Sequence, residues 1–333
     1  MVKKKKKNNY LDRKMVLVTG GTGSFGKQFI KKILKTKIKR LVVYSRDELK
    51  QEEMRTMHGF TDKRLRYFIG DVRDKERLKR AMVDIDVIVH AAALKQVEAA
   101  EYNPLEVIKT NIIGASNIID VAIDSGVKKV IALSTDKAVS PANLYGATKL
   151  VAEKLFIQGN NYSSSNGTKF CCVRYGNVVG SRGSVVPLFI HQKENGSLTI
   201  TDEKMTRFWI TLDEGVNLVL KAIKYTKGGE IFIPKISSMK IVDLAKAIAP
   251  KSKIKVVGIR PGEKIHEVLI SMEEARHTYS FGNMYVIRPM SLFNEPKNMI
   301  WKKRNLVKLP EYSSDSNDKW LTQDKLKDMI DEK

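Results

Sequence analysis

One segment near the N-terminus constrains the fold more than any other. The apolar run Met15 to Thr19 leads directly into the glycine-rich stretch Thr-Gly-Gly-Thr-Gly-Ser-Phe-Gly, residues 19–26. Gly20, Gly23 and Gly26 are spaced to permit a tight turn and to let the backbone approach a pyrophosphate at a helix N-terminus. Glycines are common in turns, so the pattern gains weight from its place between a strand and a helix that we expect from Gly26 to Ile33. The segment predicts a Rossmann-like dinucleotide-binding unit.

Short apolar runs alternate with helical stretches up to about residue 180, which predicts an α/β fold with a doubly wound parallel sheet. We expect further strands at residues 40–44, 65–69, 86–90, 130–134 and 170–174. The loop signal Gly180 to Gly183 then ends a dinucleotide-binding domain predicted over residues 13–180. Residues 181–333 predict mainly a smaller C-terminal substrate-binding lobe, with some segments returning to the first domain. Within that lobe, residues 237–248 predict a capped helix with an apolar face.

Composition excludes several classes of protein. No apolar run is long enough to span a membrane, and no apolar stretch precedes the first strand, so we expect no signal peptide and a cytoplasmic enzyme. Cys171 and Cys172 are adjacent, which offers neither a disulfide framework nor metal-ligand spacing, and we predict no metal site.

The formal net charge of +23 would suit a nucleic-acid binder or a protein that attracts an anionic metabolite. The lysines are spread along the chain, however, and the one dense run, Lys3 to Lys7, lies in a basic tail expected over residues 1–12. Since no binding motif or aromatic interleaving accompanies the charge, we predict no nucleic-acid partner.

The end of the second expected strand bears on the choice of dinucleotide. Where an acidic residue would favour NAD, the chain has Tyr-Ser-Arg-Asp-Glu-Leu-Lys at residues 44–50. Arg46, with Ser45 and Lys50, could bind a 2′-phosphate, which favours NADP. Alternatively this is a charged helix start whose acidic residues balance the helix dipole. Asp71 and Val72 are expected near the adenine, and Ala91 to Ala93 beneath the cofactor, although three alanines would equally suit tight packing.

Two groups of residues predict chemistry. Tyr145 and Lys149 lie one helical turn apart on one face. An ammonium neighbour favours the phenolate of a tyrosine, so Tyr145 could exchange a proton with an alcohol; a surface helix pair is the alternative. At the end of the fifth strand, Thr135 could bind a substrate hydroxyl, while Asp136 and Lys137 supply the adjacent acid and amine that an elimination needs. An ordinary turn with a charge pair is the alternative there.

These motifs occur in order with Arg-Tyr-Gly-Asn-Val-Val-Gly-Ser-Arg-Gly-Ser at residues 174–184 and Arg-Pro-Gly-Glu-Lys at residues 260–264. Together they resemble the inverting UDP-N-acetylglucosamine 4,6-dehydratases of the extended short-chain dehydrogenase/reductase family. The resemblance covers nearly the entire chain, including the Tyr312-Ser-Ser tail. One departure is Gln96-Val-Glu98, where the family commonly has His-Val-Pro. That change could alter substrate contacts near Lys95.

The resemblance implies a mechanism and a product. Tyr145, assisted by Lys149, takes the proton from the carbon 4 hydroxyl while hydride passes to NADP+. Lys137 removes the carbon 5 proton, Asp136 helps water leave carbon 6, and hydride returns to that carbon. Inversion at carbon 5 gives UDP-2-acetamido-2,6-dideoxy-β-L-arabino-hex-4-ulose. This reaction is the first step of pseudaminic acid-type sugar biosynthesis. Lys137 can act as a base only if burial or a positive neighbour lowers its pKa.

The predicted site residues are therefore numerous. The catalytic set is Lys137, Asp136, Tyr145, Lys149 and Thr135. The cofactor set is Gly20, Thr22, Gly23, Ser24, Phe25, Gly26, Ser45, Arg46, Lys50, Asp71, Val72, Ala91, Ala92, Ala93, Lys95, Tyr145 and Lys149. The substrate set is Lys95, Thr135, Tyr145, Asn177, Val185, Arg207, Arg260 and Glu263, in which Asn177, Arg260 and Glu263 follow from the resemblance. Surface charge is the alternative for the arginines and is as plausible as function for Arg182.

Other functions compete with this one. A UDP-sugar 4-epimerase or a dehydratase that retains carbon 5 would share the fold; Ser134 to Lys137 favours dehydration, and retaining enzymes usually carry an N-terminal membrane region. A catalytically silent NADP-sensing regulator would be expected to have lost Tyr145, Lys149 or Lys137, and all three are present. The family also implies a homo-oligomer, either a dimer or a hexamer.

Overall fold

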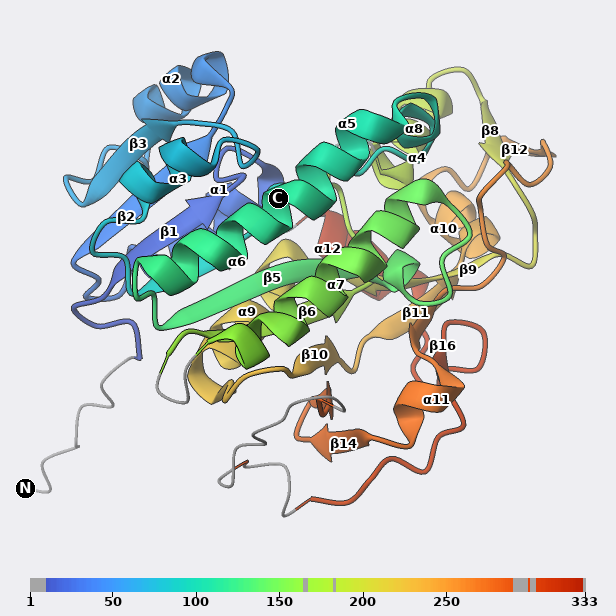
Figure 1. The fold of residues 1–333 in the computed structure, drawn as a ribbon. Coiled ribbons are helices and arrows are strands. Elements are labelled where there is room, and N and C mark those ends of the chain that lie inside the picture. Colours follow the sequence, from blue (N-terminus) through green and yellow to red (C-terminus); the bar gives the residue numbers. More distant parts are fainter. Residues whose placement is uncertain (1–9, 164–166, 182–183, 290–298, 300–303, 332–333) are drawn as a thin grey trace, which may run out of the picture.

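A mostly parallel sheet forms the centre of the molecule. The computed structural model describes residues 10–163, 167–181, 184–289, 299 and 304–331. Among these residues, nine strands pair in the order β14-β15-β10-β6-β5-β4-β1-β2-β3 (Figure 1). The strands are β1 (Met15–Thr19), β2 (Arg40–Ser45), β3 (Leu65–Ile69), β4 (Val87–His90), β5 (Lys129–Thr135), β6 (Lys169–Tyr175), β10 (Ile231–Pro234), β14 (Thr278–Phe281) and β15 (Met284–Ile287). The sheet is parallel from β3 to β10, and β15 and β14 run antiparallel at its edge. The predicted α/β fold class is confirmed.

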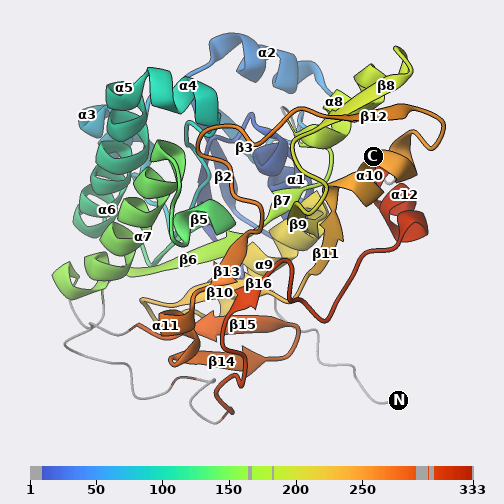
Figure 2. The same cartoon turned by 90° about the vertical axis from the view of Figure 1, so that its right-hand side faces the viewer.

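Helices cover both faces of this sheet (Figure 2). On one face α3 (Lys75–Ala81) packs against α6 (Gly114–Asp124), which packs against α7 (Leu144–Tyr162); on the other, α1 (Ser24–Ile33) packs against α9 (Leu212–Tyr225). The remaining helical segments are α2 (Glu48–Thr56), α4 (Val97–Tyr102), α5 (Pro104–Ile108), a π-helical turn (Lys109–Ile113), a 3-10 turn (Asp136–Ala138), α8 (Val185–Lys193), α10 (Ile241–Ile248), α11 (Met272–Ala275) and α12 (Gln323–Asp331). Because helices cover both faces, β1 and β4 are buried throughout, which explains their uninterrupted apolar sequences.

A smaller lobe lies beside the carboxyl ends of the parallel strands. It contains a three-stranded sheet of β7 (Asn177–Val178), β9 (Thr206–Ile210) and β11 (Ser237–Lys240). Another strand pair, β13 (Val268–Ile270) with β16 (Tyr312–Ser313), places its buried apolar side chains in the core of the large sheet. The lobe also contains β8 (Ser197–Ile200) paired with β12 (Lys253–Val256). Its separate apolar core includes Phe189, Trp209 and Leu244. In contrast, α9, β10, β14 and β15 belong to the large sheet and its helical layer.

The structure corrects some of the expected boundaries. The strand predicted from Asp86 begins one residue later, at Val87. The Asp86 carboxylate accepts hydrogen bonds from the backbone N–H of Met15 and the Lys14 ammonium. The helix predicted over residues 237–248 is wrong at its start: residues 237–240 form β11, paired antiparallel with β9, and α10 begins at Ile241. Cross-strand pairing thus overrides the local helix-start signal. In the predicted tail of residues 1–12, residues 1–9 lie outside the described part, whereas Leu11 is buried.

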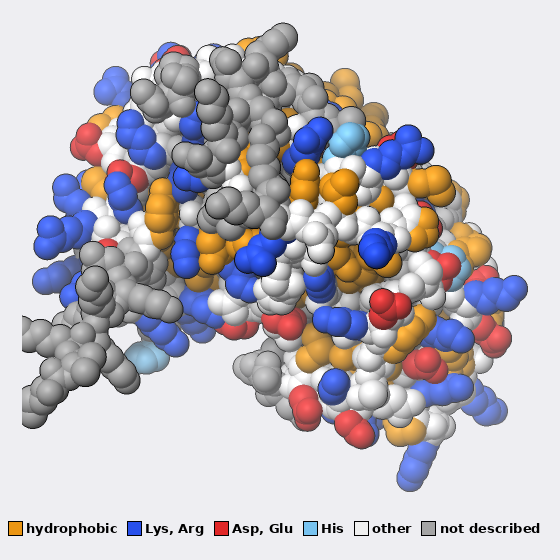
Figure 3. Space-filling view, turned by 90° about the horizontal axis from the view of Figure 1, so that it is seen from below, with side chains coloured by type: hydrophobic (Ala, Val, Ile, Leu, Met, Phe, Trp, Pro, Cys, Tyr) orange, Lys and Arg blue, Asp and Glu red, His pale blue; other side chains and the backbone are white. Residues whose placement is uncertain are grey.

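On the face shown in Figure 3, Lys and Arg side chains are spread across the surface, some of them next to one another, and Asp and Glu side chains lie among them. In the described part of the chain, no helix is both long enough and apolar enough to cross a membrane.

Candidate active site

A cavity of about 1290 Å3 lies at the carboxyl ends of the parallel strands, between the large sheet and the smaller lobe. Strand order reverses beside β1, which has β2 on one side and β4 on the other. Ligands of open α/β sheets bind at such a switch point. The cavity is lined by the glycine turn, the end of β5, the start of α7 and several loops of the lobe, so it gathers segments far apart in the sequence.

The glycine turn leaves the N-terminus of α1 open toward this cavity. Gly20 has φ of +65°, and a Cβ atom there would lie 2.9 Å from the backbone nitrogen of Ala92. A Cβ atom on Gly26 would lie 2.5 Å from the carbonyl oxygen of Gly21. The N-cap residue Gly23 has no side chain to cap the helix, and the first turn of α1 contains no acidic residue. The exposed N–H groups and the helix dipole therefore suit a pyrophosphate.

The segment after β2 was predicted to be either a 2′-phosphate site or a charged helix start, and the structure shows elements of both. Arg46 and Lys50 line the cavity, and the Arg46 guanidinium, 54% exposed, lies 3.7 Å from the Asp71 carboxylate. Asp47 caps α2 by accepting a hydrogen bond of 2.9 Å from the Lys50 backbone, and it also pairs with the Lys50 ammonium. The helix-start interpretation is therefore correct for Asp47, while Arg46 remains available to a ligand.

Most of the other predicted cofactor residues also line the cavity. They are Thr22, Ser24, Phe25, Ser45, Ala91, Ala92, Ala93 and Lys95. The Ser45 hydroxyl lies 3.0 Å from that of Thr22, which connects β2 to the glycine turn. Asp71 and Val72 are not among the residues that line the cavity: the Asp71 carboxylate accepts a hydrogen bond of 2.8 Å from Arg73, and Val72 is buried.

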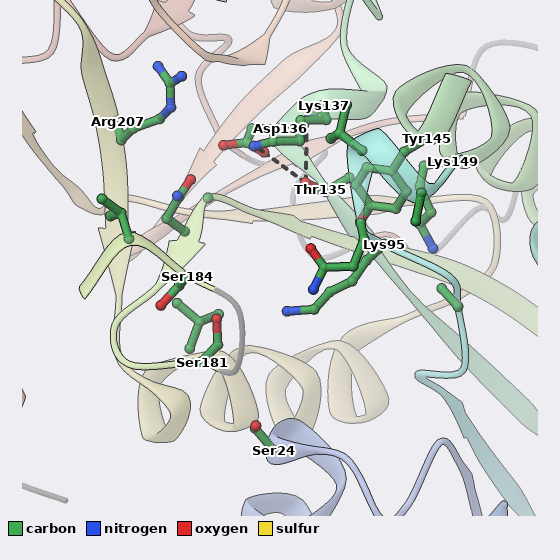
Figure 4. Close-up of a pocket in the computed structure, with 18 of the residues that line it drawn as sticks. Ser24, Lys95, Thr135, Asp136, Lys137, Tyr145, Lys149, Ser181, Ser184 and Arg207 are labelled. Carbon is green, nitrogen blue, oxygen red and sulfur yellow. Dashed lines mark hydrogen bonds and ion pairs between the residues drawn. The ribbon is translucent and has the colours of Figure 1, made fainter. Parts of the chain in front are cut away.

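The adjacent acid and amine lie in a 3-10 turn directly after β5 (Figure 4). Asp136 is 1% exposed and accepts hydrogen bonds of 2.7 Å from the Thr135 hydroxyl and 3.2 Å from Lys137 Nζ. Lys137 Nζ also lies 3.1 Å from the carboxylate of Glu267. Burial lowers the pKa of Lys137, but the two carboxylates outweigh burial and raise that pKa well above its usual value. The lowered pKa that base catalysis requires is therefore not a property of this structure.

Tyr145 and Lys149 lie on the first turns of α7, facing the same cavity (Figure 4). Asn143 fixes the start of this helix, because its side chain accepts a hydrogen bond from the Gly146 N–H and donates one to the Gly262 carbonyl of the lobe. Burial raises the pKa of Tyr145 to about 12, against the lowering effects of the Lys137 charge and a Thr135 hydrogen bond. Lys149 donates a hydrogen bond of 2.6 Å to the Leu133 carbonyl, and burial lowers its pKa.

The substrate residues predicted from the lobe all line the cavity, although their contacts differ. Asn177 Oδ1 is buried without a hydrogen-bond partner among the described residues, which leaves it for a ligand. Arg207 is buried and donates hydrogen bonds to the carbonyls of residues 206, 264 and 265. It therefore orders the loop that follows Arg260. Arg260 is exposed and lies 3.4 Å from Glu98, while Arg182 falls outside the described residues.

Glu267 is a cavity residue that the sequence analysis missed. It is 2% exposed and lies next to Lys137, although the two are far apart in the chain. A signal existed, because the acidic residue follows Arg-Pro-Gly-Glu-Lys by three positions, in Ile-His-Glu at residues 265–267.

Known proteins are similar to this chain over nearly its full length. A family model described as polysaccharide biosynthesis protein matches residues 16–289. The inverting UDP-N-acetylglucosamine 4,6-dehydratase of Campylobacter jejuni subsp. jejuni serotype O:23/36 (strain 81-176) is 53% identical over 326 residues, 95% of this chain and 97% of that protein. The UDP-glucose 4-epimerase of Rickettsia bellii (strain OSU 85-389) is 43% identical over 328 residues, 95% of each chain. The X-ray structure of Pen from Bacillus thuringiensis has a TM-score of 0.87 at 38% identity, covering 97% of this chain and 100% of that one.

Proposed function

Because the chain belongs to the polysaccharide biosynthesis protein family, we propose that it is an inverting UDP-N-acetylglucosamine 4,6-dehydratase that uses NADP. The observation that carries this proposal is the Asp136–Lys137 pair beside Tyr145 in one cavity. A 4-epimerase needs an acid/base only at the carbon 4 hydroxyl, so the additional buried acid and amine favour elimination over the epimerisation named for the Rickettsia relative.

The cavity fits a nicotinamide dinucleotide. Gly20, Gly23 and Gly26 leave the helix N-terminus accessible to its pyrophosphate, and Arg46 supplies a guanidinium for the 2′-phosphate that distinguishes NADP from NAD. Lys149, buried near the end of β5, can bind the ribose hydroxyls. A dinucleotide held by these residues would supply a nicotinamide ring that can accept hydride from sugar carbon 4 and give it back at carbon 6, so that no net oxidation would occur.

The side chains supply the proton transfers. Tyr145 takes the proton of the carbon 4 hydroxyl after it has lost its own, a loss that the nearby Lys137 charge favours and burial opposes. The ketone that forms acidifies the proton on carbon 5. The raised pKa of Lys137 keeps its amine protonated at rest, and the Asp136 carboxyl lies 3.2 Å away. Transfer of one proton from Lys137 to Asp136 gives both species that elimination requires, a neutral amine for carbon 5 and a carboxylic acid for the departing carbon 6 hydroxyl. Water leaves, and carbon 5 takes a proton from solvent on the opposite face, which inverts its configuration. Tyr145 returns the carbon 4 proton to solvent.

The polar residues of the lobe bind the nucleotide sugar. Asn177 offers an unpaired buried oxygen to the substrate. Arg260 has a guanidinium suited to a diphosphate, with Glu263 beside it. The product would enter a route of the pseudaminic acid type, and the enzyme would work as a homo-oligomer.

Proton NMR of the protein incubated with UDP-N-acetylglucosamine in D2O tests the proposal. We expect a 6-deoxy-4-keto sugar of L-arabino configuration with deuterium on carbon 5. Formation of UDP-N-acetylgalactosamine would show epimerisation instead, and a product that retains the carbon 5 configuration would refute inversion. Lys137→Ala should still bind the dinucleotide but lose deuterium incorporation. Lys129→Ala, at the opposite end of β5, where Lys129 binds the Ile223 carbonyl, is the matched control and should turn over normally.

A further inference from the structure

Glu267 is a buried carboxylate in the cavity to which the proposed steps assign no role. Its Oε1 atom lies 3.1 Å from Lys137 Nζ and 3.9 Å from Arg207 Nε. Its Oε2 atom is buried without a hydrogen-bond partner among the described residues and lies 3.9 Å from Lys264 Nζ. A carboxylate this buried is costly unless a cation accompanies it, so its place beside Lys137 requires an explanation.

The backbone around Glu267 is held in a fixed position. Its N–H donates a hydrogen bond of 2.9 Å to the Ser314 hydroxyl, and its carbonyl accepts one of 2.8 Å from the Ser314 N–H. The Ser314 hydroxyl also lies 2.6 Å from that of Thr206 on β9. The pairing of β13 with β16 supports the same segment. The carboxylate is therefore presented to Lys137 by three chain segments rather than by a mobile loop.

The charges around Lys137 show what Glu267 adds. The groups facing its ammonium from the surrounding elements are Asp136, Glu267, Arg207, Lys95, Lys264 and Tyr145. Burial and the Arg207 charge lower the pKa of Lys137, while Asp136 and Glu267 raise it. Asp136 is the proton acceptor in the proposed elimination, whereas Glu267 accepts no proton in it and adds a second carboxylate 3.1 Å from the ammonium.

We propose that Glu267 is a positioning residue for Lys137, orienting its amine in the cavity and opposing the release of its proton. The inference rests on the proposed function for its catalytic consequence. A fixed negative charge beside the ammonium holds the amine in place but also makes it a weaker acid. Neutralising that charge should leave the amine deprotonated over a wider pH range.

Glu267→Gln tests this, because the amide keeps the shape of the side chain and removes its charge. Turnover of UDP-N-acetylglucosamine should be measured against pH for the wild type and the variant. We expect the acidic limb of the variant's kcat profile to move down by about one pH unit, which corresponds to a tenfold change in the proton equilibrium. Glu267→Asp keeps the charge and should leave the limb in place while lowering kcat. Glu230→Gln removes a buried carboxylate outside the cavity and should leave the profile unchanged.

A second readout needs no turnover. Pulse acetylation with acetic anhydride, followed by peptide mass mapping, reports the fraction of Lys137 that is neutral at each pH. In Glu267→Gln the Lys137 acetylation curve should also move to lower pH, while that of Lys129 should not move. Unchanged curves in both experiments would overturn the role of Glu267 and leave the proposed function intact. A wild type that cannot dehydrate the sugar, together with a shifted acetylation curve, would refute the function and keep the Glu267–Lys137 coupling.

Discussion

Replacement of Arg174 by Met should destabilise this protein more than loss of an exposed arginine would. Arg174, on β6, is 1% exposed and donates two hydrogen bonds to Glu153 of α7, two to Glu274 of α11 and one to the Leu269 carbonyl. The variant would leave two carboxylates in the interior without their cation. Breaking a buried ion pair by removing one partner costs about 3–5 kcal/mol.

The expected change in melting temperature follows from the size of the chain. For 333 residues the entropy of unfolding is about 0.7 kcal/mol per kelvin. A loss of about 3–5 kcal/mol then lowers the melting temperature by about 4–7 °C in differential scanning calorimetry. Arg73→Ala, which removes a partly exposed arginine paired with Asp71 and Glu106, is the control and should lower the melting temperature by at most about 2 °C.

The pH dependence of the melting temperature distinguishes a loss of ion pairing from a loss of packing in the Arg174→Met variant. In the wild type, the pKa of Glu274 lies below its usual value. Burial raises this pKa, but the Arg174 charge and hydrogen bonds have the larger, opposite effect. Without Arg174, burial would raise the pKa of Glu274 above that of the unfolded chain, so the folded variant would take up a proton first as the pH falls. The deficit in melting temperature should therefore shrink between about pH 7 and pH 5. A deficit that is small, or that does not change with pH, would refute this account of the ion-pair network.

Two further predictions concern the dinucleotide. Gly26→Ala should weaken cofactor binding and lower stability by about 1–3 kcal/mol, because the new methyl group would overlap the Gly21 carbonyl; unchanged calorimetric titration with NADP would contradict this. Arg46→Ala should weaken NADP binding about tenfold, a loss of about 1.4 kcal/mol, while NAD binding stays nearly constant. Equal losses for both dinucleotides would remove Arg46 from the 2′-phosphate site.

Local sequence predicted those parts of the fold that depend on neighbouring residues. The runs that became β1, β2, β5 and β6 are apolar because central parallel strands are buried on both faces, so each could be located from its own residues. The glycine turn was equally local, since the spacing of Gly20, Gly23 and Gly26 meets a backbone requirement within one strand–turn–helix unit. The Asp136–Lys137 pair was found because it directly follows one of these strands.

Tertiary structure decided what depends on segments that are distant in the chain. Residues 237–240 form β11 because β9 pairs with them, and the sequence of those four residues does not indicate this pairing partner. In the same way, β15 and β14 extend the edge of the sheet because β15 pairs antiparallel with β10 and with β14, and β14 and β15 follow lobe segments in the chain. Glu267 reaches Lys137 only because β13 pairs with β16 and Ser314 holds its backbone. The sequence by itself therefore located the residues that we propose carry the chemistry, whereas the protonation of Lys137 also depends on a carboxylate that only the folded chain brings within 3.1 Å.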